Sequence, residues 1–103
     1  MPRVTLVRYT TLPDRAAENE ALSRAVFAEL HATKPAHIAY GLFKEPDGVS
    51  FVHVFINLKD DSSDAVTELP TFKAFGKAIT ERCVAPPVQT RLSVELVDSY
   101  GLK

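Results

Sequence analysis

The sequence predicts an α+β domain in the ferredoxin-like order βαββαβ, with a four-stranded antiparallel sheet and its helices on one face. Three observations support this prediction: alternating apolar patterns near both ends of the chain, a hairpin signal in the middle, and two stretches of helical spacing. The chain has 103 residues, of which 46% are hydrophobic and 24% charged. This size and composition are typical of a single globular domain, here spanning residues 1–103.

The charge balance and the cysteine content exclude several classes of protein. Twelve basic and thirteen acidic residues give a net charge of −1, so there is no basic surplus for binding nucleic acid. No apolar run approaches the ~20 residues that cross a bilayer. The single cysteine, Cys83, cannot form an internal disulfide, which fits a cytoplasmic protein. We therefore expect a cytoplasmic domain without a nucleic-acid partner or a membrane partner. The sequence also has no metal-ligand motif, so no bound metal is expected.

The first strand and the first helix have clear local signals. Residues 4–9 are rich in β-branched side chains and are followed by threonines and a proline, which is typical of a strand. Pro13 begins a helix, since proline is tolerated in a first turn, and large apolar residues recur every four positions from Leu22 to Leu30. Pro35 ends this amphipathic helix of about twenty residues.

A β-hairpin is predicted next, from two apolar runs at 38–43 and 49–56. The sequence Glu45-Pro-Asp-Gly48 between them favours a type I turn followed by a bulge at Gly48. This turn type predicts a register with two sets of opposite residues. One face pairs Leu42 with Val52, Tyr40 with Val54 and Ile38 with Ile56. The other face pairs Phe43 with Phe51, Gly41 with His53 and Ala39 with Phe55.

The remaining elements follow from proline positions and apolar spacing. A short helical segment is expected at 65–69, and a main helix from Pro70 to the residues before Pro86. Its apolar stripe consists of Phe72, Phe75, Ile79 and Cys83. Alternation over 89–100 predicts the last strand.

The hairpin also predicts an assembly. Two helices cover one face of such a sheet, yet residues 49–56 are apolar on both faces. In the predicted register the uncovered face presents Phe43, Phe51 and Phe55 to water, a patch that requires a partner. A second copy packed sheet against sheet is the simplest cover, so we expect a homodimer with these three side chains at its interface.

The sequence resembles the dimeric α/β-barrel superfamily, and within it the antibiotic biosynthesis monooxygenase-like group of small bacterial proteins. The resemblance spans nearly the whole chain. It rests on Val7-Arg-Tyr9 leading through Pro13-Asp-Arg-Ala-Ala-Glu-Asn-Glu-Ala-Leu22, on Gly48-Val-Ser-Phe-Val-His53, on Leu69-Pro-Thr-Phe-Lys-Ala-Phe75 and on Tyr100-Gly101. The resemblance implies a dimeric barrel of ferredoxin-like subunits.

Two activities are known in this group. Some members are cofactor-independent monooxygenases, in which a phenolic or quinol-like substrate reacts with oxygen through its own anion. Others degrade haem and depend on a histidine, an asparagine and a tryptophan. Because this chain has no tryptophan, the haem-degrading pattern is broken. We therefore expect no cofactor, and a small aromatic molecule as the ligand.

His53 is the first candidate for chemistry. A histidine can accept a proton from a phenol, and a position between Phe51 and Phe55 favours its neutral form. The competing interpretation is structural: a buried histidine satisfied by a hydrogen bond, to Glu95 or across the dimer interface.

Five further residues are candidates for a ligand pocket. Arg8 can stabilise an anionic substrate, Tyr9 and Tyr40 can line or gate a cavity, and Phe72 and Phe75 can form its wall. Each also has a structural explanation. Tyrosines at strand edges pack their rings and expose their hydroxyls, and aromatic residues at helical spacing usually belong to a core. Arg8 can be a solvated residue at a strand end.

Several functions remain open from the sequence. The first is a cofactor-independent monooxygenase with His53 as its base. The second is a non-catalytic dimer that binds a small hydrophobic ligand, and the third is a dimer whose aromatic face is interface alone. A weaker alternative is a tautomerase that uses Pro2 as its base after removal of Met1. The predicted hairpin disfavours it, because tautomerase units join parallel strands.

Overall fold

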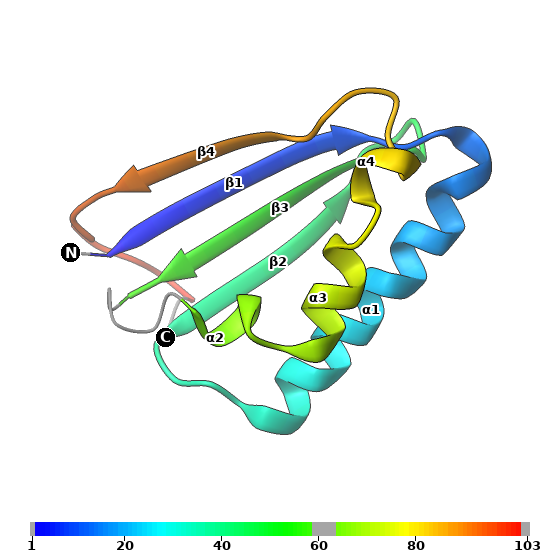
Figure 1. Ribbon diagram of the computed structural model, residues 1–103. Helices are drawn as coiled ribbons and strands as arrows, with labels where there is room; N and C mark the ends of the chain where they lie inside the picture. Colours follow the sequence, from blue (N-terminus) through cyan, green and yellow to red (C-terminus); the bar gives the residue numbers. More distant parts are fainter. Residues whose placement is uncertain (1, 59–63, 102–103) are drawn as a thin grey trace.

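The computed structural model describes residues 2–58 and 64–101 as a four-stranded antiparallel sheet with helices packed on one face (Figure 1). The strands are β1 (Arg3–Thr10), β2 (Ile38–Lys44), β3 (Ser50–Asn57) and β4 (Val88–Ser93), in the spatial order β2-β3-β1-β4. This arrangement confirms the predicted ferredoxin-like α+β fold. Among the described helices, none is long and apolar enough to span a membrane.

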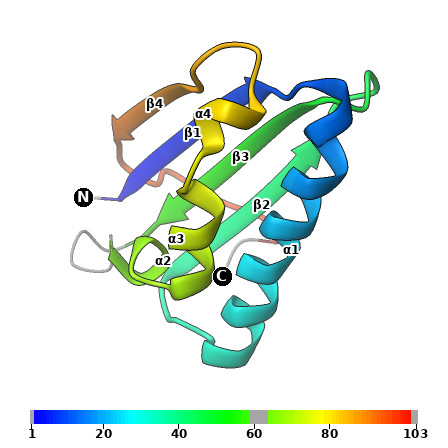
Figure 2. The ribbon, with the colours of Figure 1, turned by 45° about the vertical axis from the view of Figure 1, so that its right-hand side comes forward.

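The first helix forms as its sequence predicts. A short 3-10 turn, η1 (Pro13–Arg15), leads into α1 (Ala16–Thr33), which crosses the face of the sheet (Figure 2). The helix ends at Lys34, whose φ of 49° is left-handed and whose N–H donates to the carbonyl of Leu30 at 2.8 Å. The following proline prevents continuation.

The second helical region is broken, and the prediction of one main helix after Pro70 is wrong. It consists of α2 (Asp64–Thr67), α3 (Pro70–Gly76) and α4 (Ile79–Arg82). The break lies at Ala78, which has a left-handed φ of 60°. Two carbonyls near the break, of Phe75 and Lys77, accept hydrogen bonds from the Arg82 guanidinium at 2.7 and 3.2 Å. A buried arginine therefore supplies donors where helical amides are missing.

The hairpin register differs by one residue from the prediction. The backbone N–H of Glu45 donates to the Ser50 carbonyl at 2.8 Å, so the loop holds four residues instead of three. The Asp47 carboxylate stabilises this longer loop, because it accepts the backbone N–H groups of Val49 and Ser50 at 2.9 and 2.8 Å. Gly48 takes the left-handed φ of 78° that the turn needs.

The register decides which face of the sheet each β3 side chain occupies. Tyr40 lies opposite Phe55, and Leu42 opposite His53. Phe51, with 1% of its surface exposed, and the half-buried Phe55 therefore pack toward the helices, and their assignment to a dimer face is wrong. The same shift places Tyr40 and His53 on one face of the sheet, whereas the predicted register separated them.

Phe43 does lie on the face without helices, where it is 53% exposed. This open face carries the apolar residues Leu6, Val52, Val54, Ile56 and Leu92, with Arg8 near Phe43 at one end. The sheet therefore has an uncovered apolar face, as expected, but of the three phenylalanines assigned to it only Phe43 lies there.

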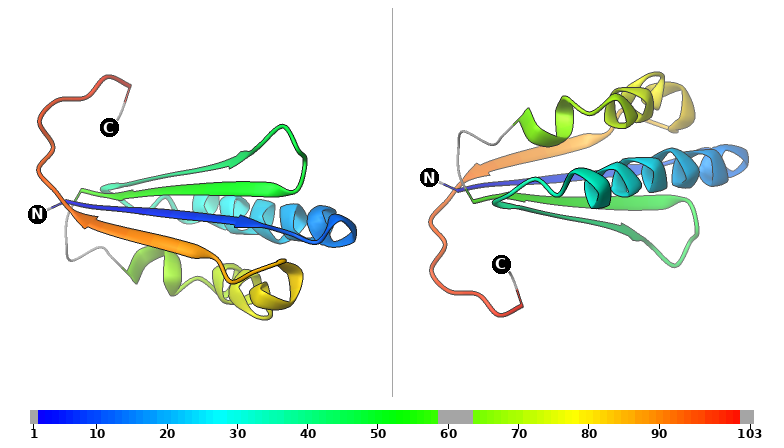
Figure 3. Two further views of the ribbon diagram at one scale, coloured as in Figure 1. Left: turned by 90° about the horizontal axis from the view of Figure 1, so that it is seen from above. Right: turned by 90° about the horizontal axis from the view of Figure 1, so that it is seen from below.

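The last strand is shorter than predicted, since β4 ends at Ser93 and the alternation up to Tyr100 is not strand. Figure 3 shows the chain after β4 leaving the sheet on the side away from α2, α3 and α4. This segment exposes Leu96, Val97 and Tyr100.

Candidate functional site

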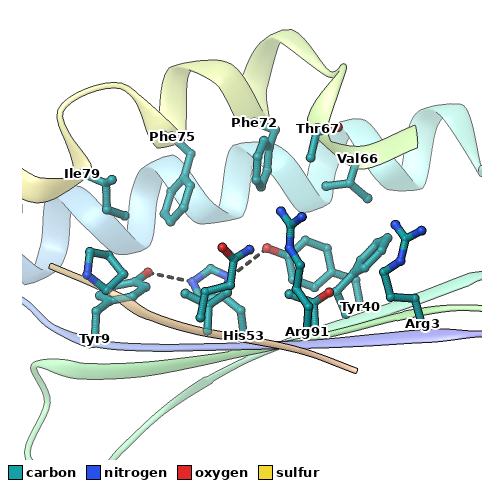
Figure 4. Close-up of a pocket in the computed structure, with 16 residues that line it drawn as sticks. Arg3, Tyr9, Tyr40, His53, Val66, Thr67, Phe72, Phe75, Ile79 and Arg91 are labelled. Carbon is teal, nitrogen blue, oxygen red and sulfur yellow. Dashed lines mark hydrogen bonds between the residues drawn. The ribbon is translucent and has the colours of Figure 1, made fainter. Parts of the chain in front are cut away.

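A pocket of about 360 Å³ lies between the sheet and the broken helical region (Figure 4). Tyr9, Tyr40 and His53 stand on the sheet side, and Phe72 and Phe75 project toward them from α3. Its volume is at the small end of the range for ligand pockets, and most of its lining is apolar. The pocket is therefore suited to a small aromatic molecule.

A hydrogen-bonded chain of three aromatic side chains crosses the sheet side of the pocket. The Tyr9 hydroxyl lies 2.7 Å from Nε2 of His53, and the Tyr40 hydroxyl lies 2.8 Å from Nδ1 of the same ring. His53 is 5% exposed and Tyr9 is 4% exposed. Both ring nitrogens are thus occupied by tyrosines, so any proton exchanged between His53 and a ligand passes through a phenol.

The chain continues behind Tyr9 into buried polar groups. Nδ2 of Asn19 donates to the Tyr9 hydroxyl at 2.9 Å, and Oδ1 of Asn19 accepts from Nε of Arg82 at 3.1 Å. Asn19 is fully buried and Arg82 is 1% exposed. The Arg82 guanidinium also lies over the Phe75 ring, 5.2 Å from its centroid. Buried hydrogen bonds therefore join α1 and α4 at the polar end of the pocket.

The Arg82 guanidinium orients the Asn19 amide. Arg82 has only donors, so Asn19 turns its oxygen to Arg82 and its NH₂ to Tyr9, which accepts this bond. The bonds between His53 and the two tyrosines have two arrangements, one for each neutral tautomer of the imidazole. In the tautomer protonated on Nδ1, Tyr9 donates to Nε2, Nδ1 donates to Tyr40, and the hydroxyl proton of Tyr40 is available to the pocket.

Burial keeps the three groups neutral. It lowers the pKa of His53 to about 4, because the imidazolium loses its hydration and no carboxylate replaces that stabilisation. It raises the pKa of Tyr9 to about 12, an effect that the hydrogen bond from Asn19 partly offsets. The pKa of Tyr40 is also raised by burial. At neutral pH the chain is therefore uncharged, and its Nδ1-protonated tautomer offers the Tyr40 hydroxyl to the pocket as a donor.

Most of the predicted site residues come together. His53, Tyr9, Tyr40, Phe72 and Phe75 all line the one pocket. The two side-chain partners of His53 are tyrosines, and Glu95 is not among them.

Arg8 is not in the pocket. Its β1 position points to the open face, where its side chain is 60% exposed and its guanidinium pairs with the Glu45 carboxylate at 2.8 Å. Pro2, the base of the tautomerase alternative, is likewise absent from the residues that line the pocket.

Sequence reasoning missed Asn19 and Arg82, together with Arg3 and Arg91 at the pocket edge. Of the two edge arginines, Arg3 had a usable sequence signal, because it precedes Tyr9 by an even number of residues on one strand and so shares its face. No sequence signal connected Asn19 with Arg82, since these two residues are 63 positions apart.

Comparisons with known proteins agree with the fold. No protein-family model matches the chain, and no curated protein matches it. Among solved structures, Rv0793 from Mycobacterium tuberculosis aligns with a TM-score of 0.77 and 20% identity, over 92% of this chain and 96% of that one. A putative antibiotic biosynthesis monooxygenase from Caulobacter crescentus aligns with a TM-score of 0.75 and 22% identity, over 91% of each chain.

A third similar structure carries a described activity. The cofactor-independent oxygenase SnoaB from Streptomyces nogalater, in a mutant form, aligns with a TM-score of 0.69 and 17% identity over 98% of each chain. The chain therefore shares the fold of antibiotic biosynthesis monooxygenase-like proteins, as its sequence resemblance implied.

The buried His53 predicts a specific dependence of stability on pH. Its folded pKa of about 4 lies below the unfolded value near 6.5, so the unfolded chain binds the extra proton between these values. Stability is therefore complete above pH 6.5 and is lost as the pH falls toward 4. We expect the free energy of unfolding to drop by about 2 to 3 kcal/mol more in the wild type than in His53→Phe between pH 7 and 4.5.

Urea denaturation at the two pH values measures this difference. Carboxylates contribute to acid sensitivity in both proteins, so only the difference between their pH dependences reports on His53. Equal losses in the two proteins would show that His53 is not held neutral by burial.

Proposed function

We propose that this protein is a cofactor-independent monooxygenase that oxidises a small phenol or quinol in the pocket between the sheet and α3. The observation that carries the proposal is the Tyr40 hydroxyl, which lines an apolar cavity and is hydrogen-bonded to the buried, neutral His53 behind it. The likeness to SnoaB in fold supports the proposal.

The donor chain suits an anionic ligand. A phenolate oxygen placed beside Tyr40 would accept a hydrogen bond from its hydroxyl. This favours the tautomer in which Nδ1 of His53 donates to Tyr40, and that bond makes the hydroxyl a better donor. In a water-poor site such a preorganised donor stabilises negative charge more strongly than in water. The weakly basic His53 thus acts through Tyr40, rather than as the direct base expected from the sequence.

The reaction balances without any added reductant. The bound naphthol loses its hydroxyl proton to solvent, and the resulting anion transfers one electron to O₂. Recombination of the two radicals forms a carbon–oxygen bond, and protonation gives a hydroperoxide. Loss of water from it then yields the quinone. Overall, C₁₀H₈O and O₂ give C₁₀H₆O₂ and H₂O, so all four electrons come from the substrate.

Oxygen uptake with a panel of naphthols and quinols tests this proposal. We expect quinone formation with one quinone per O₂, and the same rate after dialysis against EDTA. The rate of oxygen uptake should rise with pH as each substrate ionises. Above pH 5 the pH–rate profile should show no inflection from the titration of His53. Stabilisation of the fold by aromatics without turnover would instead identify a non-catalytic binding protein.

We also propose that the protein works as a homodimer joined through the open face of the sheet. The face presents Leu6, Phe43 and Leu92 with 38%, 53% and 43% of their surfaces exposed, which is unusual for a monomer. A second copy offers the same apolar surface, and a two-fold axis brings like against like. The segment after β4 leaves the sheet on the side away from α2, α3 and α4 (Figure 3).

A lysine in the middle of this face should dissociate the dimer. Val54 lies centrally on β3 between Leu6 and Gly41, so Val54→Lys would bury two charges across the two-fold axis. We expect a monomer by sedimentation velocity at micromolar concentration, against a dimer for the wild type. Ala25→Lys, on the exposed side of α1, is the control and should remain dimeric. A monomeric wild type would refute the proposed interface.

A further inference from the structure

We propose that the aromatic ligand of this pocket carries a carboxylate or a similar anionic group, and that Arg91 binds it. This inference rests on the proposed function, because it assigns the chemistry of the ligand for the same pocket. It goes further because it names Arg91, a residue outside the Tyr40–His53–Tyr9 chain, as a determinant of ligand specificity.

Arg91 is placed for this role by the register of the edge strand. It lies opposite Thr5 of β1, on the face of the sheet that the helices cover. Figure 4 shows its side chain rising from β4 toward the helix that carries Phe72, at the end of the pocket where Tyr40 lies. Arg91 is exposed and lines the pocket, so its guanidinium is accessible to a ligand there.

The surroundings of Arg91 leave its charge available. Within the described part of the chain, Arg91 has no hydrogen bond or ion pair, in contrast to Arg8, Arg15, Arg24 and Arg82. The described residues that line the pocket include no carboxylate. A guanidinium held at the edge of an apolar cavity offers a planar pair of donors that matches a carboxylate.

Binding measurements on matched ligand pairs test the inference apart from turnover. The probes are hydroxynaphthoate isomers that differ in the separation of hydroxyl and carboxylate, each compared with its neutral amide, titrated calorimetrically without oxygen. For at least one isomer we expect the wild type to bind the acid about tenfold more tightly than the amide. Arg91→Gln should remove this preference without weakening the amide, and Arg91→Lys should keep part of it.

Arg24→Gln is the matched control, since Arg24 is an exposed arginine of α1 that pairs with Glu20 away from the pocket. It should keep the full preference for the acid. Equal binding of acid and amide by the wild type, or a preference that survives in Arg91→Gln, would overturn the inference.

The two proposals fail separately. If neutral naphthols are oxidised but no acid is preferred, the inference about Arg91 is wrong and the monooxygenase proposal stands. If the acid is preferred but no probe consumes oxygen, the oxidation is wrong and the anionic ligand stands. Binding of neither member of any pair would refute both.

Discussion

Replacing Tyr40 by phenylalanine should slow oxygen uptake on naphthols about 100-fold, which is the usual effect of removing one preorganised donor to a developing oxyanion. The substitution deletes the single oxygen that joins Nδ1 of His53 to the pocket. The aromatic packing of the ring against Phe27 and Phe55 is retained. We therefore expect the rate to fall while the fold and the binding of neutral aromatics persist.

Tyr100→Phe is the matched control for this experiment. It makes the same chemical change on a fully exposed ring outside the pocket, so its rate should equal that of the wild type. Tyr9→Phe should have a smaller effect than Tyr40→Phe, because Tyr9 acts two hydrogen bonds further from the ligand. A Tyr40→Phe protein with the wild-type rate would show that Tyr40 does not contact the reacting oxygen.

Replacing Arg82 by alanine should lower the free energy of unfolding by about 3 kcal/mol, the largest stability effect we expect. The guanidinium is buried and satisfies Oδ1 of Asn19 and the carbonyls of Phe75 and Lys77. Its removal leaves these acceptors buried without donors and opens a cavity beneath the Phe75 ring. Chemical denaturation monitored by circular dichroism measures the loss.

Arg24→Ala provides the comparison for Arg82→Ala. The Arg24 side chain is 76% exposed and forms an i,i+4 pair with Glu20, so its loss should cost less than about 0.5 kcal/mol. Arg82→Lys should fall between the two variants, because an ammonium keeps the charge but cannot reach all three acceptors. A cost for Arg82→Ala similar to that of Arg24→Ala would contradict the structural role.

The pocket itself was predictable only in part. His53, Tyr40 and Tyr9 were recognisable as candidates because polar aromatics within apolar strands are unusual. Their contact was not, since the predicted hairpin register placed Tyr40 and His53 on opposite faces. A single additional loop residue, stabilised by the Asp47 carboxylate, brings the two side chains onto one face. Turn length is decided by such side-chain contacts as much as by the turn sequence.

The broken helical region shows a similar limit. Proline at 70 and apolar residues at helical spacing correctly predicted helix, because these signals act within one turn. The interruption at Ala78 depends on Arg82, whose guanidinium binds the carbonyls of Phe75 and Lys77 and also reaches Asn19 on α1. No local pattern records that contact.

The amino-acid sequence by itself determined the order of strands and helices, the uncovered apolar face and the residues able to take part in chemistry. These properties follow from periodicity, prolines and side-chain type, which are local. The tertiary structure decided which side chains meet: Phe51 in the core, Arg8 outside the pocket, and Arg82 behind Tyr9. The physical reason is that burial and hydrogen bonding join residues far apart in the chain, and a one-residue change of register moves a side chain across the sheet.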